Sequence, residues 1–244
     1  MGIRSRLSPV FELVPVVRPI GTPERHTLSG THRSLRVRVP LTSLPTAVSR
    51  STDADGIASL ARLAIRRDAG KGERGHSGRV ASLSRAVAAQ MGHVDPETAY
   101  LVGLLHDVGK TLLPWDPATI SRRLTSAETS VVRSHSELGA RAAEQAGASR
   151  EVIQGILFHH ERLDGTGYPG GFRGRAVPAL SRIVAVVDVY DALANARSYK
   201  VAWPIGRVHA YIRWQSGNSL SSQVVASVLD VTDSGLIQTS QEHS

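Results

Sequence analysis

Apolar residues recur at helical spacing along most of the chain after about residue 56. His76, Val80, Leu83, Val87 and Met91 are separated by steps of three and four, so they share one face of a helix. Similar periodicity continues over 95–108, 126–142, 149–157 and 178–188, and residues 205–236 predict one or two more helices around Gly217. We therefore predict an all-α fold in which amphipathic helices pack as a bundle.

Helix start signals agree with these ranges. Asp95-Pro96-Glu97 combines an N-cap residue, a proline at the first helical position and an acid in the first turn. Thr125 and Glu128 have the spacing of a capping box, and Ser149 can cap a further helix. We expect the helix that opens at Thr125 to run on through His135, and the helix that opens at Asp95 to run into His106-Asp107 and to close at Gly109 and Pro114.

The first part of the chain has a different composition. Residues 1–50 contain six prolines, and their only acidic residues are Glu12 and Glu24 among many basic ones. Residues 35–39 alternate like a short strand, which leaves a small β element as the alternative to an irregular arm. We predict a basic, poorly ordered arm over residues 1–55, a helical domain over 56–236 and a tail over 237–244.

Composition then narrows the chemistry. The 244 residues are 41% hydrophobic but only 5% aromatic, so the core must be built mainly from aliphatic side chains, which suits helices. Cysteine is absent, so any metal must take nitrogen and oxygen ligands. No apolar run is long enough to span a bilayer and no signal peptide is evident, so we expect a cytoplasmic protein.

A net charge of +8 permits an anionic partner such as nucleic acid, lipid or a phosphorylated small molecule. A basic solvated surface would explain the same charge. Nucleic-acid binding rests only on this charge and on the basic arm, and we expect it less than a small phosphorylated ligand.

Histidine and aspartate residues carry the most specific signal. A lone histidine on an apolar helix face is usually a hydrogen-bonded core residue, but here the same placement recurs, and buried polar groups need partners. Seven such groups can satisfy one another by sharing cations. They are His76, His106, Asp107, His135, His159, His160 and Asp188.

Seven ligands exceed the needs of one ion, so the pattern predicts two divalent metals. The two oxygens of Asp107 can bridge them, with a hydroxide held between the ions as the nucleophile for phosphoester hydrolysis. Lys110 can place an ammonium beside a phosphate oxygen, and Arg197 and Lys200, three apart, can grip phosphate from one helix face. Solvated surface charge is the alternative for these cations.

Residues 163–175 contain five glycines and predict a loop. The loop is either a connector or a segment whose backbone approaches a ligand or partner. Tyr168 within it could stack on a base or dock a protein. Spacing alone leaves these alternatives open.

These residues together resemble the HD-GYP family, a branch of the HD-domain metal-dependent phosphohydrolases. The matching segments are 76–80, 105–110, Leu124-Thr125 with Glu128, His135, 159–169, 188–192 and 197–200. The similarity covers about residues 60–230, and the long segment that ends in Gly167-Tyr168-Pro169 makes it specific.

The resemblance implies an HD-domain helical bundle with C-terminal HD-GYP helices, and hydrolysis of cyclic di-GMP to the linear dinucleotide, GMP or both. It implies one metal held by His76, His106, Asp107 and Asp188, and another held by Asp107, His135, His159 and His160. Asp107 and Lys110 are then the catalytic candidates, and Lys110, Tyr168, Arg197 and Lys200 the substrate-binding ones. Iron is expected, with manganese as the alternative.

Two positions depart from the family pattern. Gly72 stands where some members carry a glutamate for a third metal, so we predict two metals, with Glu73 as the candidate for a third. Ser198 replaces a usual proline between Arg197 and Tyr199.

Two alternative functions stay open from the sequence. The domain could hydrolyse another cyclic dinucleotide or phosphoester, since metals do not select the base. It could also be a non-catalytic cyclic di-GMP signalling adaptor. The glycine-rich loop over residues 163–175, which contains Gly167-Tyr168-Pro169 and is called the Gly-Tyr-Pro loop, is also a candidate docking site for a diguanylate cyclase domain.

Overall fold

The computed structural model describes residues 53–70, 75–120, 122–196 and 201–234. Residues 1–52 of the arm predicted over 1–55, including its strand-like segment, and the tail over 237–244 lie outside the described residues. The helical part begins at Asp53, three residues before the boundary expected from the sequence. Within the described ranges, no helix is both long and apolar enough to cross a membrane.

The predicted all-α class is confirmed. In the described residues the regular structure consists of α-helices and short 3-10 helices, and β pairing is limited to two isolated bridges. The elements are α1 (Asp53–Gly70), α2 (His76–Met91), α3 (Pro96–Leu105), η2 (Val108–Leu112), η3 (Pro117–Thr119), α4 (Ser126–Arg133), α5 (His135–Gln145), α6 (Arg150–Leu157), η4 (Gly174–Ala176), α7 (Ala179–Ala194), α8 (Ile205–Gln215) and α9 (Ser222–Asp233).

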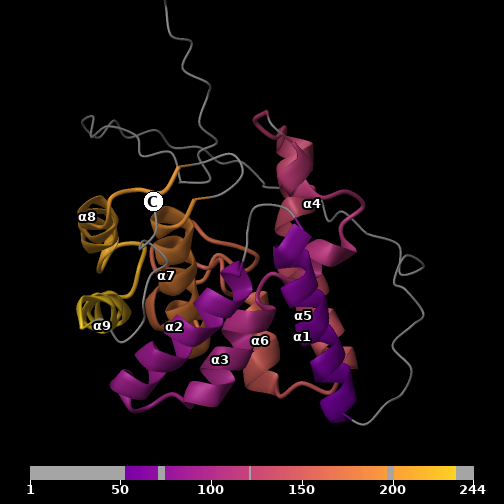
Figure 1. Ribbon diagram of the computed structural model, residues 1–244, viewed down its shortest axis with the longest axis horizontal. Helices are drawn as coiled ribbons and strands as arrows, with labels where there is room; N and C mark the ends of the chain where they lie inside the picture. The colour runs from indigo at the N-terminus through magenta and orange to yellow at the C-terminus, as the bar shows by residue number, and fades with distance from the viewer. Residues whose placement is uncertain (1–52, 71–74, 121, 197–200, 235–244) are drawn as a thin grey trace, which may run out of the picture.

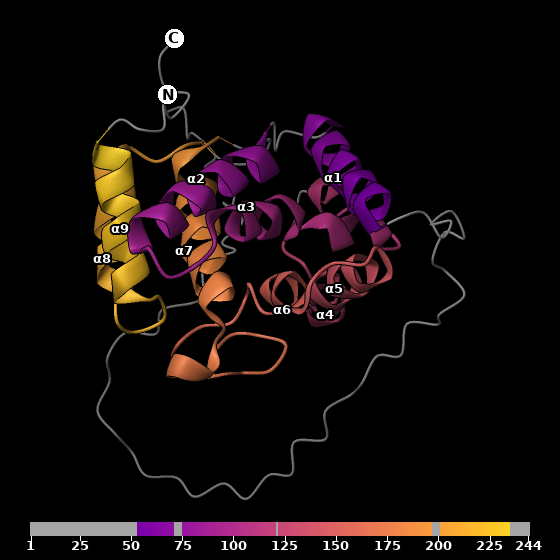
Figure 2. The ribbon, with the colours of Figure 1, turned by 90° about the horizontal axis from the view of Figure 1, so that it is seen from below.

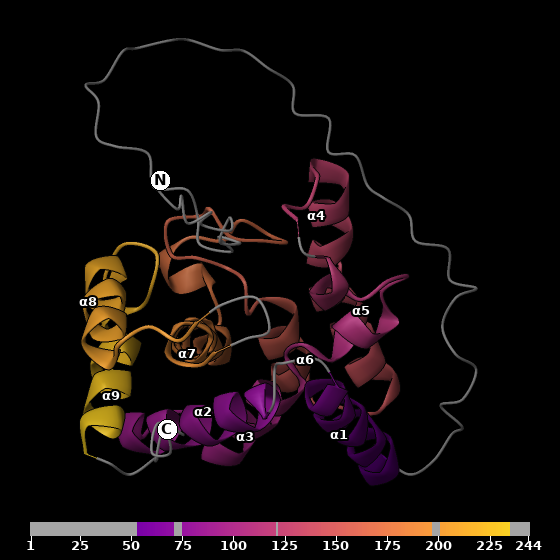
Figure 3. The same cartoon turned by 45° about the horizontal axis from the view of Figure 1, so that its top comes forward.

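Helices far apart in the chain pack around α2 and α7. Helix α2 lies along α3 and also contacts α7 and α9, while α5 packs on α6 and on η2 (Figures 1 and 2). Seen from the direction of Figure 3, α7 is almost end-on, with α8 and α9 on one side and α6 on the other. The core is aliphatic, as the composition predicted, and includes Val80, Leu105, Ile156, Ile183 and Ile212.

The predicted helix starts are confirmed by side-chain hydrogen bonds. Asp95 accepts from the Thr98 backbone N–H at 2.7 Å, and Thr125 and Glu128 form both halves of the capping box. Ser149 accepts from Val152 N at 3.4 Å. Each bond satisfies a backbone donor that the first helical turn leaves without a partner.

Two expected helix ends were wrong. The helix that opens at Thr125 stops at Arg133 and a new helix starts at His135. At the break between them, the Ser134 hydroxyl donates to Val131 O at 2.7 Å. Helix α3 stops at Leu105, so Asp107 has non-helical φ and ψ of −100° and 3°, and Lys110 lies in a 3-10 helix.

The α2–α3 crossing depends on Gly103. A Cβ atom there would lie 2.8 Å from Ala81 Cα and 2.9 Å from Val80 O, both atoms of a rigid helix backbone. Helix axes can approach this closely only where one helix lacks a side chain.

Gly103→Ala is therefore expected to lower the free energy of unfolding by about 1–3 kcal/mol through overpacking. Gly206→Ala is the matched control, because Gly206 is an exposed residue of α8 with no described atom within 4 Å of the new Cβ. The control should be neutral or stabilise by up to about 1 kcal/mol. Urea unfolding of the metal-free protein measures both, and equal effects of the two substitutions would contradict the proposed close approach.

Candidate metal centre

Asp107 occupies the centre of the cluster of predicted ligands. Its carboxylate Oδ1 lies 3.2 Å from His135 Nε2 and 4.0 Å from His159 Nε2. Its other oxygen, Oδ2, lies 3.6 Å from His106 Nε2 and 3.9 Å from His76 Nε2. The two oxygens therefore face two separate pairs of imidazoles. Because the side chain is buried, this environment is shielded from water.

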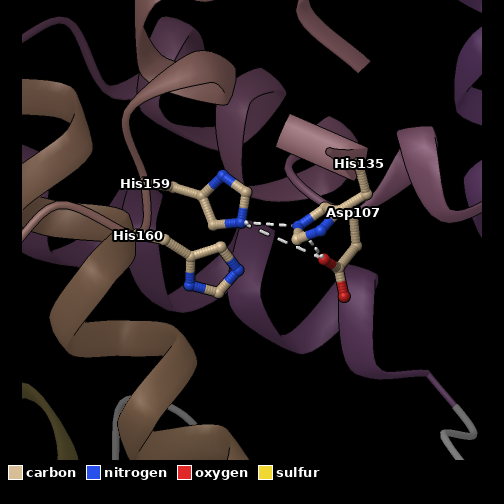
Figure 4. A group of neighbouring side chains, drawn as sticks. All are labelled: Asp107, His135, His159 and His160. Atoms are coloured by element: carbon tan, nitrogen blue, oxygen red, sulfur yellow. Dashed lines mark hydrogen bonds and ion pairs between the residues drawn. The ribbon is translucent and has the colours of Figure 1, made fainter. Parts of the chain in front are cut away.

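The ligand atoms divide into two sets that share only Asp107. One set comprises Asp107, His135, His159 and His160, and the other His76, His106 and Asp107. Figure 4 shows the first set, with the three imidazoles around the carboxylate. Asp188 Oδ1 lies 3.4 Å from His76 Nε2 and 3.9 Å from His106 Nε2, so it belongs to the second side. The structure thus brings together all seven predicted ligands.

Three of the histidines are oriented by the same local hydrogen bond. The Nδ1 atoms of His106, His135 and His159 lie 2.7, 2.6 and 2.6 Å from the carbonyl oxygen three residues earlier. A carbonyl oxygen only accepts, so each Nδ1 carries the proton and each Nε2 presents a lone pair to the centre. Each of these bonds also uses a carbonyl at the end of a helix.

His76 is oriented from another helix. Its Nδ1 lies 2.7 Å from Asp191 Oδ2, and Asp191 also accepts from Arg79 Nε at 2.6 Å and Asn195 Nδ2 at 2.9 Å. Burial tends to raise the pKa of Asp191, but the hydrogen bonds from His76 and Arg79 prevail and lower that pKa to about 2. An ionised Asp191 therefore fixes the His76 tautomer.

The arrangement of the nitrogen atoms fits bound cations. His135 Nε2 and His159 Nε2 are 3.3 Å apart, so the tautomers just assigned point two lone pairs at each other. Burial, followed by repulsion from His106 and His135, lowers the pKa of His159 well below its ordinary value, so protonation is disfavoured. His106 Nε2 is buried without a hydrogen-bond partner among the described residues. Divalent cations that accept imidazole nitrogen would relieve both situations.

The protonation states are those that metal binding requires. Burial lowers the pKa of His106, and it also lowers the pKa of His160 well below the ordinary range. For Asp107, burial acts to raise the pKa, but the positive charge of Lys110 and the neighbouring His106 and His135 hold it well below its usual value. Lys110 Nζ donates directly to Asp107 Oδ2. Neutral imidazoles and an ionised carboxylate are ready to bind metal near neutral pH.

Of the remaining predicted site residues, Tyr168 is described and lies in a loop. Tyr168 stacks on His160, with ring centroids 4.7 Å apart and an interplanar angle of 26°, so it borders the first set of ligands. Arg197 and Lys200 lie outside the described residues, as do Gly72 and Glu73. Their predicted roles therefore stay predictions.

Sequence reasoning assigned no role to Glu161, although it is buried beside the cluster. Its carboxylate accepts backbone N–H groups from Gly170, Gly171 and Phe172 at 2.5, 3.1 and 3.0 Å. The residue thus ties the glycine-rich loop to the segment that carries His159 and His160. No role was predicted for Asp191 either, although it lies in the family-like segment 188–192 and three residues after Asp188, which places both on one helix face.

Comparison with known proteins agrees with this geometry. A family model for the HD domain matches residues 59–220. The cyclic di-GMP phosphodiesterase response regulator RpfG of Xanthomonas campestris is 37% identical over 157 residues, which are 62% of this chain and 41% of RpfG. Cyclic di-GMP phosphodiesterase PA4108 of Pseudomonas aeruginosa is 42% identical over 131 residues, 52% of this chain and 32% of that protein.

A third relative, 3'3'-cGAMP-specific phosphodiesterase 1 of Vibrio cholerae, is 36% identical over 152 residues, 61% of this chain and 35% of that protein. The chain thus spans less than half the length of these three relatives. Among solved structures, the HDG"Y"P protein Bd1817 of Bdellovibrio bacteriovorus has a TM-score of 0.54 at 23% identity, covering 65% of this chain and 51% of that one, which shows a shared fold.

The described domain is a helical phosphohydrolase-type fold with a buried histidine and aspartate centre, and the chain belongs to the HD-domain family. The resemblance to the HD-GYP branch is confirmed by the relatives and by the shared fold.

The low pKa values of the buried histidines predict how stability depends on pH. Unfolding returns His106, His159 and His160 to an ordinary pKa of 6.5, so below about pH 6.5 the unfolded chain binds more protons than the folded one. The free energy of unfolding of the metal-free protein should therefore fall as pH drops from about 7 to about 5. Asp107 contributes only in a lower window, below its ordinary pKa of 3.8.

Urea unfolding at a series of pH values measures this slope. His159→Gln should reduce the slope by up to about 1.4 kcal/mol per pH unit, the value for one proton. His93→Gln is the control, because His93 is exposed beyond the end of α2 and outside the centre. A wild-type stability that does not change over this pH range would refute the assignment of buried neutral imidazoles.

Proposed function

We propose that the chain is a metal-dependent phosphodiesterase that hydrolyses cyclic di-GMP to the linear dinucleotide, GMP or both. The observation that carries this proposal is the position of Asp107, whose two oxygens face two separate sets of imidazole nitrogens. A single shared carboxylate between two ligand sets suits a pair of divalent cations. Relatives named as cyclic di-GMP phosphodiesterases support the choice of substrate.

In this proposal the two cations share Asp107 and otherwise have separate ligands. His76, His106, Asp107 and Asp188 would hold one, and Asp107, His135, His159 and His160 would hold the other. The cations are iron, with manganese as the alternative, and when bound they lower the pKa of water so that a hydroxide nucleophile is present near neutral pH. Carbonyl groups and Asp191 keep the imidazole lone pairs pointed at the centre, and burial excludes bulk water.

Substrate binding is proposed to rest on cations of the chain. Lys110 places its ammonium beside Asp107 and would bind a phosphate oxygen, with Arg197 and Lys200 contributing further positive charge. The Gly-Tyr-Pro loop presents exposed Pro169 and Gly170, and we propose it as the contact for a diguanylate cyclase domain. Turnover of a nucleotide messenger would place the domain in the cytoplasm.

A second substrate is favoured by one observation. A relative with 36% identity is named as specific for 3'3'-cGAMP. The ligand sets act on phosphate and do not distinguish guanine from adenine, so the base preference must come from other residues.

Purified protein loaded anaerobically with Fe(II) or Mn(II) is expected to convert cyclic di-GMP to linear products. Chromatography measures the formation of these products over time. Cyclic di-GMP should be turned over faster than 3'3'-cGAMP under matched conditions. A faster rate with 3'3'-cGAMP would move the proposal to the second substrate. No linear product from any cyclic dinucleotide, with the metal content confirmed, would refute the enzymatic proposal and favour the adaptor alternative.

Asp107→Ala is expected to reduce kcat by more than about 100-fold, because both cations lose their shared ligand. This loss exceeds the roughly 10- to 100-fold loss of activity that follows removal of a group that only hydrogen-bonds to a metal ligand. Glu144→Ala removes an exposed carboxylate of α5 and should leave kcat unchanged. Retained turnover in the Asp107 variant would contradict the bridging role.

A further inference from the structure

Two arginines beside the Gly-Tyr-Pro loop form no direct ion pair with a carboxylate among the described residues, although the charge of Arg162 interacts at longer range with Asp164 and Asp188. Arg133, in the last turn of α4, is exposed, and its guanidinium lies over the Tyr168 ring at 5.0 Å from the centroid. Arg162 is partly buried, and its only side-chain hydrogen bond to described residues runs from Nη1 to Glu161 O at 3.0 Å. Neither forms an ion pair with a carboxylate in the part of the chain that the structure describes.

Three other arginines, Arg79, Arg85 and Arg122, each pair with a carboxylate at 2.6, 2.5 and 2.6 Å. What distinguishes Arg162 from exposed arginines is that it is partly buried next to the metal centre. A guanidinium has five N–H donors, so Arg162 leaves most of its hydrogen-bonding capacity unused among the described residues. A partly buried guanidinium with unused donors beside the metal centre is suited to bind an anionic ligand.

Both arginines lie close to the ligand set that contains His135 and His160, and the charge of Arg162 also interacts with Asp188 of the other set. Arg133 precedes His135 by two residues, and Arg162 follows His160 by two. The Tyr168 ring, over which Arg133 lies, itself stacks on His160. The two positive charges are therefore connected through direct neighbours to the ligand set formed by Asp107, His135, His159 and His160.

A cyclic dinucleotide carries two phosphodiesters in one ring, and the metal centre can act on only one of them at a time. The other must lie beside the centre as an anion that needs its own binding group. We propose that Arg133 and Arg162 bind the phosphodiester that is not being cleaved. This inference rests on the proposed function, and it adds two substrate-positioning residues outside the metal ligands and outside Lys110, Arg197 and Lys200.

A structural role for Arg133 is the competing explanation. Its contact with the Tyr168 ring could stabilise the loop without touching substrate, at about 0.5–1 kcal/mol for an exposed cation–π pair. Such a role would affect every substrate alike. A role in binding the second phosphodiester affects only substrates that contain two phosphodiesters.

Steady-state kinetics on two substrates separate these roles. Cyclic di-GMP has two phosphodiesters, whereas bis(p-nitrophenyl) phosphate has one. Arg133→Gln and Arg162→Gln should each lower kcat/KM for cyclic di-GMP by about 10- to 100-fold, mainly through KM, because a charge-assisted hydrogen bond is lost. The loss on bis(p-nitrophenyl) phosphate should be smaller by at least about tenfold. Arg141→Gln, at an exposed position of α5, is the matched control and should change neither.

Folding of the Arg162 variant is checked by its thermal midpoint, and Arg162→Lys, which keeps the charge, should recover part of the lost affinity. Equal losses on the two substrates would overturn the inference, as would an unchanged KM for cyclic di-GMP. If the wild type binds cyclic di-GMP without turnover, the proposed function fails and calorimetric titration of the metal-loaded protein decides the inference. Weaker binding by both glutamine variants then supports it, whereas unchanged affinity, or no binding by the wild type, overturns it.

Discussion

The centre depends on a short hydrogen bond that is repeated three times. In each case a histidine Nδ1–H donates to the carbonyl three residues earlier, at 2.6 or 2.7 Å. The bond uses a carbonyl that would otherwise continue or extend the helix, and it turns the opposite ring nitrogen inward. His106 and His159 stand just beyond the ends of α3 and α6, and His135 begins α5 after the break that follows α4. Asp107 lies at the point where these helix ends converge.

The rest of the fold holds these helix ends in position. Helices α2 and α3 cross closely at Gly103, and α7 supplies a largely buried apolar face together with Asp188 and Asp191. The Glu161 carboxylate accepts hydrogen bonds from three backbone N–H groups of the Gly-Tyr-Pro loop, in which Tyr168 stacks on His160. The low pKa values of the buried imidazoles and of Asp107 follow from this packing and from Lys110. Packing and charge together thus favour neutral imidazoles and an ionised Asp107, the forms that bind metal.

Much of this arrangement could be predicted from residue spacing, and the failures have physical causes. Apolar periodicity and caps such as Asp95 and Thr125 located the helices, because both act within one turn of the chain. Periodicity could not show the break at Ser134 or the early end of α3, since a side chain that bonds its own backbone leaves no trace in the apolar pattern. Glu161 and Asp191 were missed because their partners are backbone groups or residues of distant helices.

The central claim is that Asp107 joins two metal sites. Metal content per chain, measured by elemental analysis after anaerobic loading with Fe(II) or Mn(II) and removal of free ions, tests it most directly. The wild type should hold about two equivalents, His76→Gln and His135→Gln about one each, and Asp107→Ala none, because only Asp107 belongs to both ligand sets. An Asp107→Ala protein that folds and still holds two equivalents would contradict the account.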